Sequence, residues 1–205
     1  MIVPGLGSER KLWAKGLHAV AGIDEAGRGA WAGPVVAAAV VLPRGDRYLL
    51  RTLLGVRDSK TLSSRQRERL FPLIVSTASA VGVGMASARF IDRMGIVAAT
   101  RQAMEMAVAN LGLTPDHLLI DALRLELQVP QTALIKGDAT VLSIAAASII
   151  AKVFRDRLLV ALAESYPCYG FAAHKGYGTA AHRAALMAAG PCPEHRLSFA
   201  PLRGL

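Results

Sequence analysis

Cysteine, aromatic residues and long apolar runs are scarce in this chain of 205 residues. Its two cysteines, Cys168 and Cys192, form no Cys-x-x-Cys pair, so the sequence predicts neither a disulfide framework nor a structural zinc site. No uninterrupted apolar run approaches the roughly 18 residues of a membrane span, and no basic and apolar leader opens the chain. We expect a cytoplasmic protein with reduced thiols and no membrane partner.

Acidic residues are also outnumbered, with 15 Asp and Glu against 24 Lys and Arg and a formal net charge of +9. Such a charge attracts polyanions, so nucleic acid is a candidate partner. A generically basic protein would show the same balance, so the charge alone does not separate the two. The length suffices for one domain with its own core, and a monomer is expected.

Five short apolar segments predict the strands of a mixed sheet, at 18–24, 35–43, 77–88, 118–120 and 133–135. The first two or three are expected to pair in antiparallel order. Helical spacing runs from Ile96 to Asn110 with Gly112 placed to end that helix, and a long helix is expected over 139–164. The pattern predicts the α/β class, with a mixed five-stranded sheet flanked by helices.

Local signals predict two more helices. Ser63 and Gln66 form a capping-box pattern, so a helix should begin at 64 and break or kink near Pro72. The tail after Pro167 is rich in glycine, aromatic and basic residues and contains a candidate helix over 180–189. We interpret the tail as a small C-terminal helical extension.

Carboxylates follow apolar, strand-like segments at three separate points: the adjacent Asp24 and Glu25, then Asp121, then Asp138. Neighbouring strand residues point to opposite faces, so the backbone must bend at 26–27 if both members of the first pair are to face one site. Oxygen ligands with several retained waters suit Mg²⁺. The sequence therefore predicts a magnesium-dependent enzyme that cuts phosphodiester bonds by two-metal-ion catalysis.

Other interpretations of these residues are weaker. A single aspartate is most often a helix cap or an ion-pair partner; we assign those roles to Asp92 as a cap and to Asp156 within a local ion pair. The glycines around Asp24 come close to a nucleotide-binding loop, but arginine replaces the required lysine and two acids would lie in the phosphate cradle.

The chain resembles the prokaryotic ribonuclease HII family from about residue 18 to residue 202. The motifs that carry the resemblance are Gly22-Ile23-Asp24-Glu25-Ala26-Gly27-Arg28-Gly29, Asp58-Ser59-Lys60, Ile120-Asp121, Lys136-Gly137-Asp138, Arg155-Asp156, His174-Lys175-Gly176-Tyr177-Gly178 and His195-Arg196-Leu197-Ser198-Phe199. One departure is Ala122, because the family usually has glycine after its third acid. The related type HIII enzymes are a less suitable match, since they carry a substantial N-terminal extension.

The resemblance implies a ribonuclease H-like fold, with a catalytic domain at 1–165 and an extension at 166–205 that completes the substrate cleft. It implies that Asp24, Glu25, Asp121 and Asp138 are catalytic and bind Mg²⁺ or Mn²⁺. The residues implied to contact substrate are Gly27, Arg28, Gly29, Ser59, Lys60 and Tyr177. Among these, Tyr177 would hydrogen-bond the 2′-OH, the atom that distinguishes RNA from DNA.

The implied activity is endonucleolytic cleavage of RNA in RNA/DNA hybrids, and cleavage 5′ to single ribonucleotides in DNA, leaving 3′-OH and 5′-phosphate ends. Replication or repair proteins are possible partners. Two alternatives remain: a non-catalytic hybrid-binding module, which should lack one of the four acids, and a DNA nuclease of the same fold, which would not need the Gly-Arg-Gly turn with Tyr177.

Several further residues receive predicted roles. Candidates for contacting backbone phosphates, besides Ser59 and Lys60, are Lys152, Lys175, Arg196 and His174. Ser148 is expected to bond back to a helix carbonyl, and His182 and His195 are expected to be structural.

Overall fold

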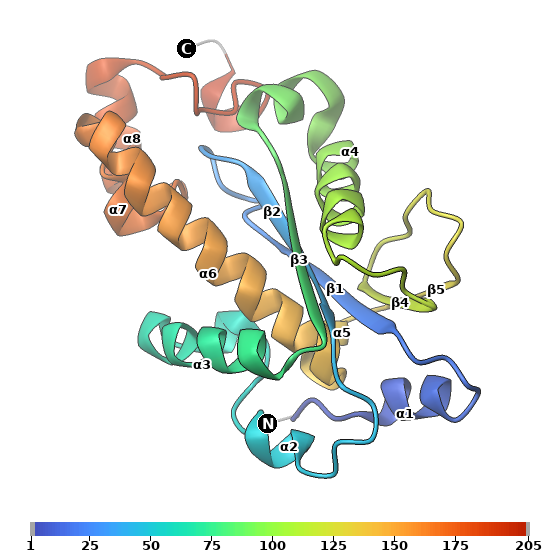
Figure 1. The fold of residues 1–205 in the computed structure, drawn as a ribbon. Helices are drawn as coiled ribbons and strands as arrows, with labels where there is room; N and C mark the ends of the chain where they lie inside the picture. The colour runs from blue at the N-terminus through green and yellow to red at the C-terminus, as the bar shows by residue number, and fades with distance from the viewer. Residues whose placement is uncertain (1–2, 204–205) are drawn as a thin grey trace.

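A computed structural model describes residues 3–203 and contains a five-stranded sheet between helices (Figure 1). The strands are β1 (Val20–Ala26), β2 (Val35–Val41), β3 (Ala80–Ala86), β4 (His117–Asp121) and β5 (Gln131–Leu134). Their order is β3-β2-β1-β4-β5. The pairs β1·β2 and β2·β3 are antiparallel, whereas β1·β4 and β4·β5 are parallel. The predicted mixed sheet and its antiparallel first three strands are therefore confirmed.

Eight α-helices accompany these strands within residues 3–203. They are α1 (Gly7–Trp13), α2 (Leu49–Thr52), α3 (Ser64–Thr77), α4 (Ala88–Ala109), α5 (Gly137–Thr140), α6 (Leu142–Ser165), α7 (Phe171–His174) and α8 (Ala180–Ala189). Short 3-10 turns cover Ser59–Thr61, Pro167–Tyr169 and Ala200–Leu202. None of these helices combines the length and apolar character needed to cross a bilayer.

The alternation of side chains along β2 explains the two apolar layers. Val35, Ala37, Ala39 and Val41 pack with α4 on one face, while Ala38 and Val40 pack with α6 and α3 on the other. Figure 1 shows α6 and α4 on opposite sides of the sheet. Because both of its faces are covered, β2 is apolar throughout instead of alternating with polar residues.

Helix α6 lies unusually close to β1 because residue 22 is glycine. A Cβ atom added to Gly22 would lie 2.3 Å from the backbone carbonyl carbon of Ser143 and 2.5 Å from the backbone nitrogen of Ile144. The first turn of α6 therefore rests directly on the backbone of the strand that carries Asp24. This contact fixes the height of the helix above the predicted catalytic strand.

The predicted helix over 139–164 is wrong at its start. Val141 is extended and separates α5 from α6, because it forms a β-bridge with Gly5. Backbone bonds from Gly5 N to Thr140 O (3.1 Å) and from Leu142 N to Gly5 O (3.0 Å) hold this break. The N-terminal segment thus decides where α6 begins, and no signal within 139–164 reveals it.

Two other helix predictions need correction. Helix α3 has the predicted capping box at Ser63, but it continues through Pro72 to Thr77. Both Pro72 and Glu68, whose carbonyl loses its hydrogen bond to the ring, are exposed, so water can replace that bond. Helix α4 starts earlier than predicted, at Ala88, and is interrupted by Gly95 with φ of 81°.

The C-terminal segment packs around the far end of α6. A small apolar cluster joins Leu159 of α6 to Tyr169, Phe171 and Leu186, and it also contains Ala32 from the loop between β1 and β2. Helix α8 spans the predicted range and is followed by Gly190 in a left-handed conformation. The extension is therefore attached to the same loop that follows the Gly27–Gly29 turn.

Candidate active site

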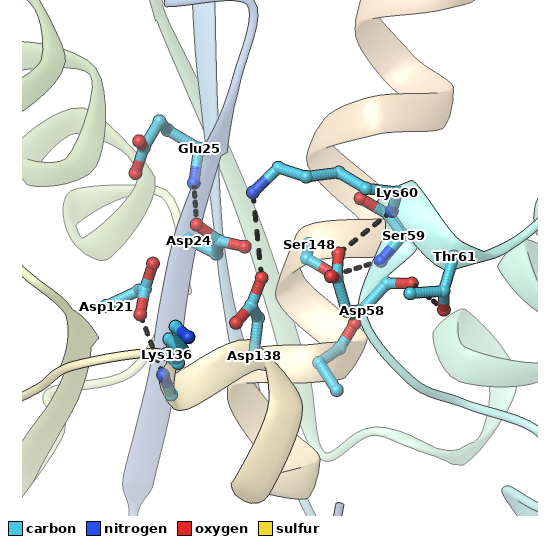
Figure 2. A network of polar contacts seen from close by, with 12 residues as sticks. Asp24, Glu25, Asp58, Ser59, Lys60, Thr61, Asp121, Lys136, Asp138 and Ser148 are labelled. Carbon is cyan, nitrogen blue, oxygen red and sulfur yellow. Dashed lines mark hydrogen bonds and ion pairs between the residues drawn. The ribbon is translucent and has the colours of Figure 1, made fainter. Parts of the chain in front are cut away.

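Three elements bring the predicted acids to one edge of the sheet (Figure 2). Asp24 lies in β1, and Asp121 is the last residue of the neighbouring parallel strand β4, whose Ile120 pairs with Ile23. Asp138 does not end a strand as expected; it lies in the first turn of the short helix α5. A hydrogen bond of 2.7 Å from Gly137 N to Asp121 Oδ1 holds that helix against β4.

The backbone turns at Gly27, whose φ is 92°, so the bend predicted at 26–27 comes only after the two acids. Strand β1 remains paired with β2 as far as Ala26, opposite Val36, so the two acids project to opposite sides of a regular strand. In Figure 2 the Glu25 side chain extends away from Asp138. Glu25 instead contacts Arg28 at 3.3 Å, which ties it to the glycine turn that follows the strand.

Burial and neighbouring negative charges raise the pKa values of Asp24, Glu25 and Asp138. Burial raises the pKa of Asp24 well above 3.8, and the charges of Glu25, Asp121 and Asp138 raise it further. The pKa of Glu25 is also raised, mainly by burial, although Arg28 opposes the effect. The pKa of Asp138 is raised by burial and by nearby Asp58 and Asp121. The site concentrates negative charge that a cation would stabilise.

Lys60 supplies the cation nearest to Asp138 in the part of the chain that is described. Its Nζ lies 3.7 Å from Asp138 Oδ2. Burial lowers the pKa of Lys60, but Asp24 and Asp138 outweigh that effect, so its pKa is raised. Lys60 is therefore charged at neutral pH, and 79% of its side chain remains exposed for contact with an anion.

The chemistry of the acids suits a divalent metal ion. Glu25 Oε2 is buried and has no hydrogen-bond partner, so one oxygen is free to bind a cation. Within residues 3–203, no three acidic, histidine or cysteine side chains already have the spacing of a closed metal cage. Mg²⁺ does not require one, because it retains waters and takes one or two carboxylates together with substrate phosphate oxygens.

All six predicted substrate-binding residues line one cavity of about 380 Å³ next to the acids. Its lining is Glu25, Ala26, Gly27, Arg28, Gly29, Ser59, Lys60, Lys152 and Tyr177. A second cavity of about 480 Å³ contains Asp121 and Asp138 in its lining, and Lys60 borders both. The acids and the predicted substrate contacts are thus contiguous, although they come from segments far apart in the sequence.

The Ser59–Lys60 segment is held by its neighbours on both sides. Asp58 Oδ1 accepts a bond of 2.9 Å from Lys60 N, and Ser59 N donates to Ser148 Oγ at 3.2 Å. Ser148 Oγ donates to Ala145 O at 2.8 Å, which confirms its predicted bond to a helix carbonyl. Ser59 itself is buried, and its backbone N and O are both bonded to neighbouring residues.

Arg155 packs against the glycine turn, a role that its place in the Arg155-Asp156 motif did not predict. A Cβ added to Gly27, whose φ is 92°, would lie 2.0 Å from Arg155 Nε. The buried guanidinium donates to the carbonyls of Pro34, Ala32 and Lys175, each at 2.9 Å. An arginine inside an apolar helix was the available signal, because a buried charge needs several partners.

Two residues predicted to contact phosphate are structural instead. Arg196 is fully buried and donates to Gly33 O at 3.0 and 2.8 Å and to Arg28 O at 2.9 Å, because the loop between β1 and β2 needs donors there. His174 uses both ring nitrogens, at 2.7 Å from Tyr169 O and 3.2 Å from Gly176 N. Burial therefore keeps Arg196 away from a phosphate, and both ring nitrogens of His174 are already in use.

The remaining polar predictions have mixed outcomes. His182 and His195 are buried with their Nε2 atoms 3.0 Å apart, as expected for structural residues. Asp156 forms the expected pair with Lys152 at 2.7 Å. Asp92 is not a cap, since Ser87 caps α4 and Asp92 accepts bonds from the backbone nitrogens of residues 197 and 198. Both cysteines are free thiols.

Together the mixed sheet, the acids at its edge and the donor-lined cavity define a class of protein, the metal-dependent nucleases. Comparison with known proteins narrows this class. The family model for Ribonuclease HII matches residues 21–202. A Ribonuclease HII from Roseiflexus castenholzii is 56% identical over 200 residues, covering 97% of this chain and 89% of the relative.

Solved structures agree with that match. The ribonuclease H2 of Pyrococcus horikoshii OT3 superimposes with a TM-score of 0.73 at 29% identity, covering 90% of this chain and 95% of the other. The ribonuclease HII in a PCNA complex from Archaeoglobus fulgidus gives a TM-score of 0.73 at 29% identity, covering 88% and 95%. The chain belongs to the ribonuclease HII family. It is a metal-dependent endoribonuclease that hydrolyses the RNA strand of RNA/DNA hybrids.

Proposed function

We propose that this enzyme also cleaves on the 5′ side of a single ribonucleotide embedded in duplex DNA, leaving 3′-OH and 5′-phosphate ends. The observation that carries the proposal is the cavity in which Tyr177 and the Gly27–Gly29 turn adjoin Glu25 and Lys60. One ribonucleotide offers a single distinguishing group, the 2′-OH. A cavity that combines a phenol with close backbone approach can test for that group beside the cleaved bond.

In the proposed mechanism, Asp24, Glu25, Asp121 and Asp138 hold two divalent ions, Mg²⁺ or Mn²⁺. When bound, these ions would activate a water and stabilise the departing oxygen. The carboxylates would supply the negative charge that retains the ions. Their mutual repulsion in the absence of a cation supports this role. Lys60, which is charged and exposed near Asp138, would hold a backbone phosphate of the substrate.

The substrate would be recognised from the other side of the cavity. The Tyr177 hydroxyl would hydrogen-bond the 2′-OH, and the Tyr177 ring would stack on the neighbouring sugar. Gly27, Arg28 and Gly29 would present backbone groups to the ribonucleotide; Gly29 has no atom near its missing side chain, so the backbone is accessible there. Ser59 would complete the cavity wall.

We also propose that residues 1–165 form the catalytic domain and residues 166–205 an extension that completes the cleft. The extension carries Tyr177, and its Gly176 carbonyl accepts bonds from Trp31 N (2.8 Å) and Ala32 N (3.2 Å). These bonds join it directly to the loop after the glycine turn. Deletion of the extension should therefore remove the 2′-OH contact as well as part of the apolar core.

The test is cleavage of a DNA duplex with one ribonucleotide, beside an all-DNA duplex, with Mg²⁺ or with a chelator. The proposal requires metal-dependent cutting 5′ to the ribonucleotide and an intact control. Cutting of both duplexes would favour the DNA-nuclease alternative. Binding of an RNA/DNA hybrid without any cutting would favour a non-catalytic module. The Asp138→Asn variant, which lacks one proposed metal ligand, should bind the hybrid but not cut it.

The cellular setting follows from this activity. We propose that the enzyme acts in the cytoplasm as a monomer, removing misincorporated ribonucleotides and RNA primers. The ribonuclease HII of Archaeoglobus fulgidus forms a complex with PCNA, which supports replication or repair proteins as partners here. Light scattering would test the monomer, and affinity capture on a purified replication clamp would test the partner.

A further inference from the structure

Asp156 is a buried carboxylate on α6 that lines neither cavity of the candidate site. Each of its oxygens contacts a different cation. Oδ1 lies 2.7 Å from Lys152 Nζ on the preceding turn of α6, and Oδ2 lies 3.6 Å from Arg67 Nη2 on α3. All three side chains are at least 80% buried, since their exposed fractions are 12%, 19% and 13%. Asp156 therefore joins two elements beneath the cleft.

The first arm of this network leads to Tyr177. Lys152 Nζ lies 5.1 Å from the centre of the Tyr177 ring, within the range of a cation–π interaction. Lysine has a flexible four-carbon stem, so its ammonium keeps that position only if another group holds it. The short contact with Asp156 Oδ1 provides that constraint. Two cations face the Tyr177 ring, since Arg155 Cζ lies 5.4 Å from its centre, and a carboxylate that does not touch the ring holds one of them, Lys152.

The second arm leads to the opposite wall of the cleft. Arg67 Nη1 donates to Ser59 O at 2.9 Å and to Leu62 O at 2.6 Å, the two carbonyls that bracket the 3-10 turn carrying Lys60. Its other terminal nitrogen faces Asp156. Removal of the carboxylate charge would free the guanidinium that holds this turn. Both walls of the cavity are thereby linked through one side chain.

We propose that Asp156 is a positioning residue that sets the distance between Tyr177 and the Ser59–Lys60 turn. This inference rests on the proposed role of Tyr177 in contacting the 2′-OH. Asp156 itself lines neither cavity of the site, and its ion-pair partners are Lys152 and Arg67, not the four acids. Its loss should impair recognition of a single ribonucleotide more than cleavage of a long hybrid, because a hybrid offers a 2′-OH in every register.

A neighbouring ion pair provides a matched control. Arg157 and Glu68 also join α6 to α3, with Nη2 and Oε2 2.5 Å apart, but their side chains are 54% and 43% exposed. Neither residue lines the cavity of about 380 Å³ that contains Tyr177. An exposed pair of this kind contributes little to stability. Glu68→Gln therefore removes a link between the same two helices without removing the contacts of Asp156 with Lys152 and Arg67.

The experiment compares Asp156→Asn with Glu68→Gln on a single-ribonucleotide duplex and on a long RNA/DNA hybrid, with kcat and KM measured separately. Asp156→Asn should lower kcat/KM at the single ribonucleotide about tenfold, and the hybrid should be affected less. Glu68→Gln should leave both unchanged. Asp156→Glu, which keeps the charge, should restore part of the selectivity. Thermal unfolding of each variant establishes that it is folded.

A double variant separates this inference from the function on which it rests. In a Tyr177→Ala background, Asp156→Asn should cause no further loss of selectivity, because both changes act through one ring. If Tyr177→Ala leaves selectivity unchanged, the proposed 2′-OH contact is wrong. If Tyr177→Ala alters selectivity but Asp156→Asn lowers both substrates equally or neither, Asp156 is only a structural ion-pair partner and the inference is overturned.

Discussion

Single residues at the site are strained in ways that serve binding rather than stability. Asp24 is 4% exposed, and its charge is opposed by burial and by three other acids. Ala122, directly after Asp121, has φ of 55°, a left-handed conformation that is unfavourable for any residue with a Cβ. The alanine at this position therefore occupies a conformation that suits glycine and adds strain beside a proposed metal ligand.

The raised pKa of Asp24 predicts that its charge destabilises the metal-free protein. The folded state binds the proton more tightly than the unfolded chain, whose pKa is near 3.8. This stabilisation is complete below that value and is lost as the pH rises through the raised pKa. In chelator at pH 7, Asp24→Asn should increase the free energy of unfolding by at least about 1 kcal/mol while abolishing cleavage.

The increase in the free energy of unfolding caused by Asp24→Asn should become smaller as the pH falls to about 4, near the ordinary pKa of an aspartate side chain. Asp116→Asn serves as the control of opposite sign, because bonds from Ala19 N and His18 N lower the pKa of Asp116. That variant should be less stable at neutral pH. Thermal melts across the pH range measure the stability of both variants. The same change in stability with pH in Asp24→Asn and Asp116→Asn would contradict the electrostatic account.

Relief of strain at position 122 gives a second prediction. Ala122→Gly should stabilise the protein by about 0.5 to 1 kcal/mol, because glycine adopts the left-handed conformation without a steric cost. The matched control is Ala14→Gly, at an exposed residue with φ of −65°, which should lower stability instead. Chemical denaturation measures the free energy of unfolding of the two variants. A loss of stability in both would be inconsistent with strain at Ala122.

At the level of elements, the position of α6 governs the site. This helix contributes Lys152, Arg155 and Asp156, and its first turn lies against Gly22 of the strand that carries Asp24. Arg155 packs directly against Gly27 and holds the neighbouring segments through the carbonyls of Ala32, Pro34 and Lys175. The helix is thus a rigid support for both the catalytic edge and the cavity that adjoins it.

The close approach at Gly22 can be tested directly. Gly22→Ala should lower the free energy of unfolding by about 1 to 3 kcal/mol, because its Cβ would meet backbone atoms that cannot rotate away. Gly7→Ala in α1 meets no atom within 4 Å and should leave stability unchanged or slightly higher. Urea unfolding measures both. A stable, fully active Gly22→Ala variant would show that α6 can shift away from β1.

For the whole molecule, the charge of +9 coexists with a cluster of acids at the catalytic edge. The basic residues attract the substrate backbone, and the acids attract the cations that screen repulsion between substrate and site. Binding should therefore depend strongly on salt, while the choice of the cleaved bond depends on the local contacts.

Salt dependence of hybrid binding measures this balance. With the inactive Asp138→Asn variant, affinity should fall at least about tenfold between 50 and 200 mM salt, because counterions are released from the phosphates. Adding Lys60→Gln to that variant should reduce the slope of log K against log salt by about one, as expected for one lost phosphate contact. An unchanged slope would remove Lys60 from the proposed phosphate contacts.

The sequence by itself determined the five strands, the mixed sheet and the four acids, because apolar periodicity and isolated carboxylates are local patterns. Tertiary structure alone decided the remainder. Val141 is extended because Gly5 pairs with it, and Arg155 matters because carbonyls more than 100 positions earlier in the chain need its donors. Glu25 turns away from Asp138 because β2 keeps β1 regular. Hydrogen-bond partners distant in sequence leave no local periodicity, so these features appear only when the chain is folded.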